Sequence, residues 1–256
     1  MDYKLIFKCA LLTGEIMLRN GAEMHRVEDT ILRILKTTNF EVTECFATPT
    51  GIFVTLDDPS IDMVTTIKRV HHRTNHLHKV QMANNISREY VNGNISAPLA
   101  YQKLVKVTKE QPYGPTLTII AYCFTAAFFA PVFGGDFNDF IVSAIIGLAI
   151  GFVIVFLEKR NVSIFIIDII GGMIVGLIAI IFCQVISFGH NFDTIIISSI
   201  MPLVPGLAIT NAVRDTFQGH LVSGISRAVE AFFIAVCIAS GVGIILDFYF
   251  SYIGGL

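Results

Sequence analysis

Residues 198–215 decide the fold of this chain and read Ser-Ser-Ile-Met-Pro-Leu-Val-Pro-Gly-Leu-Ala-Ile-Thr-Asn-Ala-Val-Arg-Asp. The stretch is apolar enough to lie in a membrane, yet Pro202, Pro205 and Gly206 fall near its middle. Each proline lacks an N–H and clashes with the carbonyl four residues back, so two carbonyls of the preceding turn lose their usual partners. We therefore expect a helix that breaks inside the membrane.

The carbonyls affected by this break lie near Ser198 and Met201. In hydrocarbon such groups are tolerated only where protein or a water-filled cavity satisfies them. Transporters use broken helices at mid-depth to hold substrate. The break is thus a candidate binding site, in which a half-helix starting near Val204 presents its amides to a carboxylate. The alternative is that the break only shapes the helix bundle.

The composition divides the chain into two parts that meet at residues 111–115. Hydrophobic residues make up 54% and charged residues only 15%, against about 25% charged in a soluble domain. Of the 18 Lys and Arg, 14 precede Pro115, as do 12 of the 20 Asp and Glu. We expect a polar domain over residues 1–112 and a membrane domain over 113–256. The net charge of −2 does not indicate nucleic-acid binding.

The first part reads as a small α+β domain. Apolar residues recur at helical spacing in four segments and alternate in three, and the turns between them contain Asn-Gly, Thr-Pro-Thr-Gly and Asp-Asp-Pro-Ser. Residues 1–10 are too charged for a signal peptide, so this domain is expected in the cytosol. The predicted helices are 3–20, 23–38, 74–91 and 98–109, and the predicted strands are 41–47, 51–56 and 62–70.

The second part contains five apolar segments long enough to cross a membrane, which takes roughly 17–25 residues. Lys159 and Arg160 follow the second segment, whereas Arg214 and Arg227 follow the fourth, so the positive-inside rule places these charges in the cytosol and the C-terminus outside. The fold class is therefore an α-helical polytopic membrane protein with five transmembrane helices and an N-terminal cytosolic α+β domain. The predicted spans are 116–133, 140–157, 162–188, 194–213 and 228–250.

Small residues at four-residue spacing predict close contacts between these helices. One such face lies on the second span and another on the third, where it includes an aspartate. The odd span count excludes a simple internal two-fold repeat, so any pseudo-symmetry must come from a second copy or a second protein. The two faces are Ser143, Gly147 and Gly151, and Asp168, Gly172 and Gly176.

Two carboxylates within the spans are candidates for carrying a proton. Asp168 lies about two turns into the third span and Glu230 just inside the fifth. Charges inside spans usually face the bundle or an aqueous cavity and mark proton relays. The alternative for both is an interfacial carboxylate that reaches water. Asp247, near the outer end of the fifth span, is expected to be interfacial.

Asn211 and Arg214 follow the break and are candidates for binding substrate. Arg214 could attract an anionic substrate or neutralise Asp168, Asp215 or Glu230. It could equally be a charged helix end that obeys the positive-inside rule. Asn211 could bond a substrate or another helix.

No metal, cofactor or disulfide site is predicted. The five cysteines are scattered without a CxxC pair. His72 and His76 would share a helical face, but no carboxylate has matching spacing, so a solvated basic turn is the better interpretation. A nucleophile elbow, a Walker A loop and a dinucleotide fingerprint are absent from the sequence. An enzyme site without a local motif remains open.

Three runs of residues resemble the threonine/serine exporter (ThrE-like) family. They are Gly-Glu-Ile-Met-Leu-Arg-Asn-Gly-Ala-Glu-Met-His-Arg-Val-Glu at 14–28, Thr-Pro-Thr-Gly-Ile at 48–52, and Pro-Leu-Val-Pro-Gly at 202–206, followed by Gly224 and Glu230. The resemblance covers essentially the whole chain. It implies a cytosolic N-terminal domain, five spans and proton-driven export of small amino acids or small carboxylates.

Long members of that family carry a second set of about five spans, so the resemblance is to the short, split type. It implies a bacterial plasma-membrane exporter that works with a second small membrane subunit or as a homo-oligomer. We expect Pro202, Pro205, Gly206, Asn211 and Arg214 to bind threonine, serine or a dicarboxylate such as succinate. Asp168 and Glu230 would couple the proton. Two other classes remain: a membrane-tethered enzyme with its site in the cytosolic domain, and a non-transporting scaffold or regulator.

Overall fold

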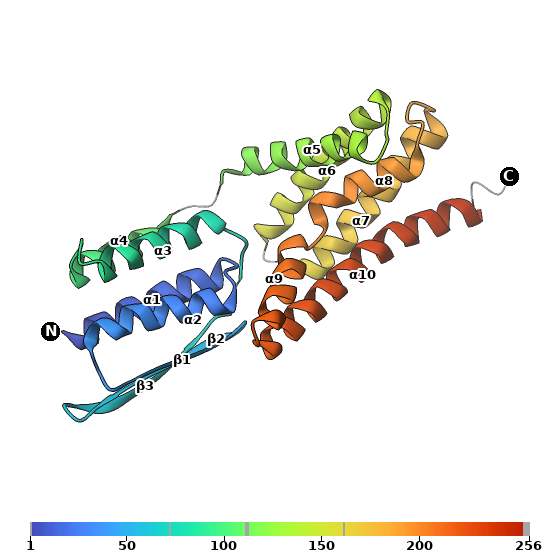
Figure 1. Ribbon diagram of the computed structural model, residues 1–256. Helices are drawn as coiled ribbons and strands as arrows, with labels where there is room; N and C mark the ends of the chain where they lie inside the picture. The colour runs from blue at the N-terminus through green and yellow to red at the C-terminus, as the bar shows by residue number, and fades with distance from the viewer. Residues whose placement is uncertain (1, 72, 111–112, 161, 253–256) are drawn as a thin grey trace. The chain divides into compact units, whose positions relative to one another are not determined.

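The computed structural model describes residues 2–71, 73–110, 113–160 and 162–252, and its chain forms two compact units (Figure 1). The first unit contains Met1–Pro112 and Gly206–Val229, and the second contains Tyr113–Pro205 and Glu230–Leu256. The boundary at Pro205 and Gly206 falls within the run that contains the two prolines. The segment that follows the break therefore packs with the N-terminal residues.

The first unit consists of helices and one small antiparallel sheet, in the strand order β1-β2-β3. Every strand and helix predicted for residues 1–112 is present, with ends that differ by about three residues at most. The last predicted turn of the second helix is a 3-10 turn, Lys36–Thr38. The elements are α1 (Tyr3–Arg19), α2 (Met24–Leu35), β1 (Val42–Thr48), β2 (Gly51–Asp58), β3 (Ile61–Arg69), α3 (Leu77–Val91), α4 (Ala97–Lys109), α9 (Gly206–Phe217) and the start of α10 (Leu221–Tyr252).

The N-terminal elements form three layers, with α1 and α2 between the sheet and the pair α3 and α4 (Figure 1). Ile52, Val54 and Leu56 of the central strand are buried in one core with Met17 and Ile31 of the two middle helices. Buried and exposed side chains alternate along β2 because successive side chains point to opposite faces of the sheet. Phe53, on the other face, is therefore exposed. The sheet therefore has one face in the core and one open face.

A tight turn joins α1 to α2. Asn20 closes α1 by donating from its side-chain amide to the carbonyl of Ile16, at 2.6 Å. Gly21 follows with φ of +91°, a conformation that a residue with a Cβ adopts only at a cost. The chain can then reverse direction within four residues, and α2 begins at Met24.

The second unit is a helical bundle. Four helices of the described residues are long and apolar enough to cross a membrane, and a fifth span is present if the sharply bent pair Phe192–Leu203 and Gly206–Phe217 counts as one. The sequence predicted five. The helices are α5 (Pro115–Val132), α6 (Phe137–Glu158), α7 (Ile164–Ile180) with a π-helical continuation (Ile181–Val185), α8 (Phe192–Ile200) and the remainder of α10.

Small residues bring the bundle helices together, as the sequence predicted. A Cβ on Gly147 would lie 2.6 Å from the carbonyl oxygen of Tyr122 on α5, and one on Gly172 would lie 2.4 Å from the carbonyl oxygen of Ile238 on α10. Ser143 of α6 shares a hydrogen bond of 2.8 Å with Ser198 of α8. The glycines therefore allow backbone-to-backbone contact at positions where any side chain would collide.

Candidate functional site

The break in residues 198–215 is local and its carbonyls are satisfied. A 3-10 turn, Met201–Leu203, follows α8, and Val204 is extended with ψ of 129°. The amide of Met201 donates to the carbonyl of Ser198, and the amide of Val204 donates to the carbonyl of Met201 at 3.2 Å. Both carbonyls that the prolines deprive of their usual partner thus accept from a residue three positions on.

The half-helix after the break starts later than predicted. We expected it near Val204, but α9 begins at Gly206. The reason is that the ring of Pro205 disfavours helical geometry in the residue before it, which keeps Val204 extended. The first amides of α9 are therefore those of Gly206 and the residues that follow.

Within the second unit, the break packs against the part of α7 that carries Asp168. Leu203 lies against Gly171, since a Cβ on that glycine would be 3.0 Å from the leucine Cδ1. Asp168 is three residues earlier, on the same side of α7, and only 5% of it is exposed. Its Oδ2 has no hydrogen-bond partner among the described residues. Because α7 begins at Ile164, Asp168 lies one turn into the helix and not two.

Glu230 lies on α10, which runs beside α7 in the same direction. Gly172 faces Ile238 and Gly176 faces Ile245, so both helices advance together. Gly241 in turn packs against the carbonyl of Ile169. With a rise of about 1.5 Å per residue, this register puts Glu230 roughly two turns before the level of Asp168. Glu230 is half-buried. The two predicted proton carriers are thus on neighbouring helices, near the same end of the bundle.

Asn211 lies in the first unit, where it contacts the turn between α1 and α2. Its side-chain amide donates to the carbonyl of Gly21 at 3.0 Å, and 3% of the residue is exposed. Arg214, one turn further, forms an ion pair with Glu23 of the same turn. The partner that the structure gives Arg214 is therefore none of the three that we had considered. Its side chain remains 58% exposed.

Two charged residues that the sequence did not mark as a pair meet at the same turn. The Nε of Arg227 is 3.1 Å from the Oδ2 of Asp215, an ion pair whose alignment is not that of a hydrogen bond. Arg227 also donates from Nη2 to the carbonyl of Ala22 at 2.8 Å, and Asp215 accepts from the amide of Met24 at 3.0 Å. In the sequence, the Asn-Gly-Ala-Glu run at residues 20–23 marks this turn, but it does not reveal the residues that bind it.

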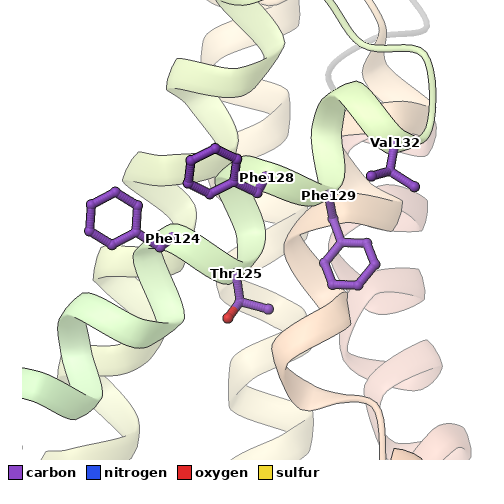
Figure 2. A pocket seen from close by; sticks show the side chains of 5 residues that line it. All are labelled: Phe124, Thr125, Phe128, Phe129 and Val132. Carbon is purple, nitrogen blue, oxygen red and sulfur yellow. The ribbon is translucent and has the colours of Figure 1, made fainter.

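No group of three potential metal ligands occurs among the described residues. His72, half of the metal pair that the sequence raised as an alternative, lies outside them. Two hollows accompany the helices. One of about 400 Å³ is lined only by α5, and Figure 2 shows its side chains: Phe124, Thr125, Phe128, Phe129 and Val132. The other, of about 560 Å³, lies between α3 and α4 and includes Lys103 and Lys106. Neither contains a predicted site residue.

Residues 8–249 match the sequence profile of the family described as "Putative threonine/serine exporter". The chain belongs to this threonine/serine exporter family. The match covers the N-terminal domain, the break and the bundle together, so this exporter is a multi-pass membrane protein with a transporter role and a small-molecule substrate. The family is one of exporters and not of enzymes. No curated protein and no solved structure matches the chain.

Proposed function

We propose that the protein exports threonine and serine, or small dicarboxylates such as succinate, across the bacterial plasma membrane by proton-coupled secondary transport. The observation that carries the proposal is the pairing of a buried carboxylate with a helix break. Asp168 lies one turn from the glycine against which Leu203 packs. Its Oδ2 is buried without a hydrogen-bond partner among the described residues, which makes the charged form costly and favours a role in binding and releasing a proton.

The substrate site of this proposal is the start of α9. Pro202, Pro205 and Gly206 end one helix and begin another. The first amides of a helix have no partners within it and carry partial positive charge, so they suit the carboxylate that threonine and succinate share. The carbonyls before the break already have hydrogen-bond partners. The first amides of α9 are therefore the backbone groups that bind the substrate carboxylate in this proposal.

Asn211 and Arg214 contribute to this site in different ways. Asn211 is occupied by the carbonyl of Gly21, which favours holding α9 in place over direct contact with substrate. Arg214 keeps more than half of its side chain exposed, so it can attract an anionic substrate from the cytosol while it pairs with Glu23. Asp168 carries the coupling proton, and Glu230, on the neighbouring helix, is the second candidate carrier.

The proposed orientation has the N-terminal domain in the cytosol and the C-terminus outside. The contacts of Asn211 and Arg227 with the turn after α1 support it, because they join α9 and the start of α10 to that domain. The positive charges Lys159 and Arg160 agree with the same side.

Efflux of radiolabelled serine, threonine and succinate tests the function, in cells with and without a co-expressed second membrane chain. In proteoliposomes, Asp168→Asn should abolish the dependence of export on the proton gradient, whereas the matched control Asp193→Asn, at the exposed start of α8, should not. Unchanged proton-coupled export by Asp168→Asn would contradict the proton role. Activity of the N-terminal domain on a small molecule would favour the enzyme class, and variants that alter assembly without altering flux would favour the scaffold.

A further inference from the structure

The turn between α1 and α2 is held by three side chains of the α9–α10 hairpin. We call this set of contacts the junction: backbone groups of residues 20–24 on one side, and Asn211, Asp215 and Arg227 on the other. Asn211 donates to the carbonyl of Gly21, Arg227 donates to the carbonyl of Ala22, and Asp215 accepts from the amide of Met24. Three polar side chains therefore bind three backbone groups of one turn.

These three polar side chains are buried, whereas several large apolar side chains of the same two helices are exposed. Asp215 is 0% and Arg227 6% exposed, whereas Val213, Phe217 and Ile225 on the same two helices are exposed. Removing one partner of a buried ion pair typically costs several kcal/mol. The α9–α10 hairpin can therefore keep Asp215 and Arg227 buried only while they bind the turn between α1 and α2.

Asp215 also acts as a cap for α2. Met24 is the first residue of that helix, and its amide is one of the four that a helix leaves unpaired at its start. A carboxylate at this end is favourable because the helix dipole is positive there. Glu23, the residue before, makes no capping bond with its own side chain, since it faces Arg214. The N-terminus of α2 is thus capped by Asp215, which lies 191 positions later in the chain.

We propose that the junction is a permanent coupling interface, so that the N-terminal domain, α9 and the start of α10 act as one body throughout transport. Asp215 and Arg227 are then positioning residues: they hold the half-helix that follows the break, and they touch no substrate. The unit boundary at Pro205 and Gly206 agrees, because the chain passes from one compact unit to the other there. The part of this proposal that concerns transport rests on the function proposed above.

The first experiment measures the local stability of the junction and does not depend on transport. Hydrogen exchange of the full chain in lipid nanodiscs follows peptides that cover residues 20–27 and 211–227. Asp215→Asn and Arg227→Gln should each raise exchange in both peptides by about tenfold or more, because each breaks a buried ion pair. The matched controls are Asp29→Asn and Arg33→Gln, which break an exposed ion pair on α2. Exchange in both variants as slow as in these controls would overturn the proposal, and Arg227→Lys serves if Arg227→Gln does not fold.

The second experiment asks whether the junction stays closed during transport. The Oε1 of Glu28 and the Nδ1 of His220 lie 3.9 Å apart beside the junction, and neither residue belongs to the proposed substrate site. The double variant Glu28→Cys/His220→Cys is joined by a short bis-maleimide, with the reagent-treated parent chain as control. The joined protein should keep its transport rate, and joining should restore the rate lost in an Asp215→Asn background. Loss of transport on joining would show that the junction opens, which overturns permanence. If the parent chain exports none of the substrates, the proposed function fails while the exchange result still stands.

Discussion

The Nε of Arg227 lies 3.1 Å from the Oδ2 of Asp215, and the two side chains are 7% and 0% exposed. One comes from the start of α10 and the other from α9, so the pair closes the hairpin. Each partner also binds the turn after α1, Arg227 through the carbonyl of Ala22 and Asp215 through the amide of Met24. The pair therefore joins three segments of chain and not two.

Removing either partner should destabilise the protein strongly. Asp215→Asn or Arg227→Met should each cost about 3–5 kcal/mol, because the remaining buried charge loses its ion-pair partner. The double variant should cost less than the sum, since it leaves no unpaired charge, although the cap on Met24 is still lost. Chemical denaturation of the purified protein in detergent measures the three values, and strictly additive costs would show that the pair does not interact.

Gly21→Ala should destabilise the turn after α1. The backbone has φ of +91°, and the new Cβ would lie 3.1 Å from the Cδ2 of Leu207 on α9. The left-handed conformation alone costs about 1–2 kcal/mol for a residue with a Cβ. Gly93→Ala is the matched control, because Gly93 has φ of +77° and nothing within 4 Å of the added atom. A larger fall in melting temperature for Gly21→Ala than for Gly93→Ala is expected, and equal falls would show that the contact with α9 is unimportant.

Gly172→Ala should disrupt the contact between α7 and α10. The added Cβ would lie 2.4 Å from the carbonyl oxygen of Ile238, and backbone cannot move aside as a flexible side chain can. Overpacking of this kind costs typically about 1–3 kcal/mol. Gly243→Ala on α10 has nothing within 4 Å and should be neutral or slightly stabilising. The measurement is the fraction of each variant that stays monodisperse after heating. Equal fractions for Gly172→Ala and Gly243→Ala would contradict the close contact between α7 and α10.

Cys45 should resist alkylation until strongly basic pH. Burial, together with the nearby carboxylates of Glu28 and Glu44, raises the pKa of this thiol to about 12. Since the thiolate is the reactive form, a raised pKa keeps Cys45 protonated and slow to react throughout the neutral range. Mass spectrometry after maleimide treatment at several pH values measures the labelling. Rapid labelling of Cys45 near pH 8 would contradict the burial.

Much of the helical organisation could be predicted because it depends on neighbours in the chain. Pro202 and Pro205 break their helix wherever it lies, since each lacks an N–H and carries a ring. The faces with Gly147 and Gly172 were visible as four-residue spacings, and both meet another helix. The start of α9 lies two residues later than predicted because Pro205 keeps Val204 extended.

The partners of the polar residues could not be predicted. Asn211 was interpreted as a group that bonds substrate or another helix. Arg214 was interpreted as a substrate ligand, a charged helix end or the partner of a carboxylate such as Asp215. The structure joins them to residues 20–24, which are about 190 positions earlier in the chain. Spacing identifies which residues share a helical face, but it does not reveal which distant backbone group that face will meet.

The sequence by itself determined the apolar segments, the break at Pro202–Gly206, the three strands and the family, because these follow from local backbone geometry, from the water-avoidance of apolar side chains and from motifs written in order. Only the tertiary structure decided that α9 belongs with the N-terminal residues and that Asp168 lies beside the break. The physical reason is that a buried polar group must find a partner in space, and the pairing of Asp215 with Met24 and Arg227 satisfies this need across the whole length of the chain.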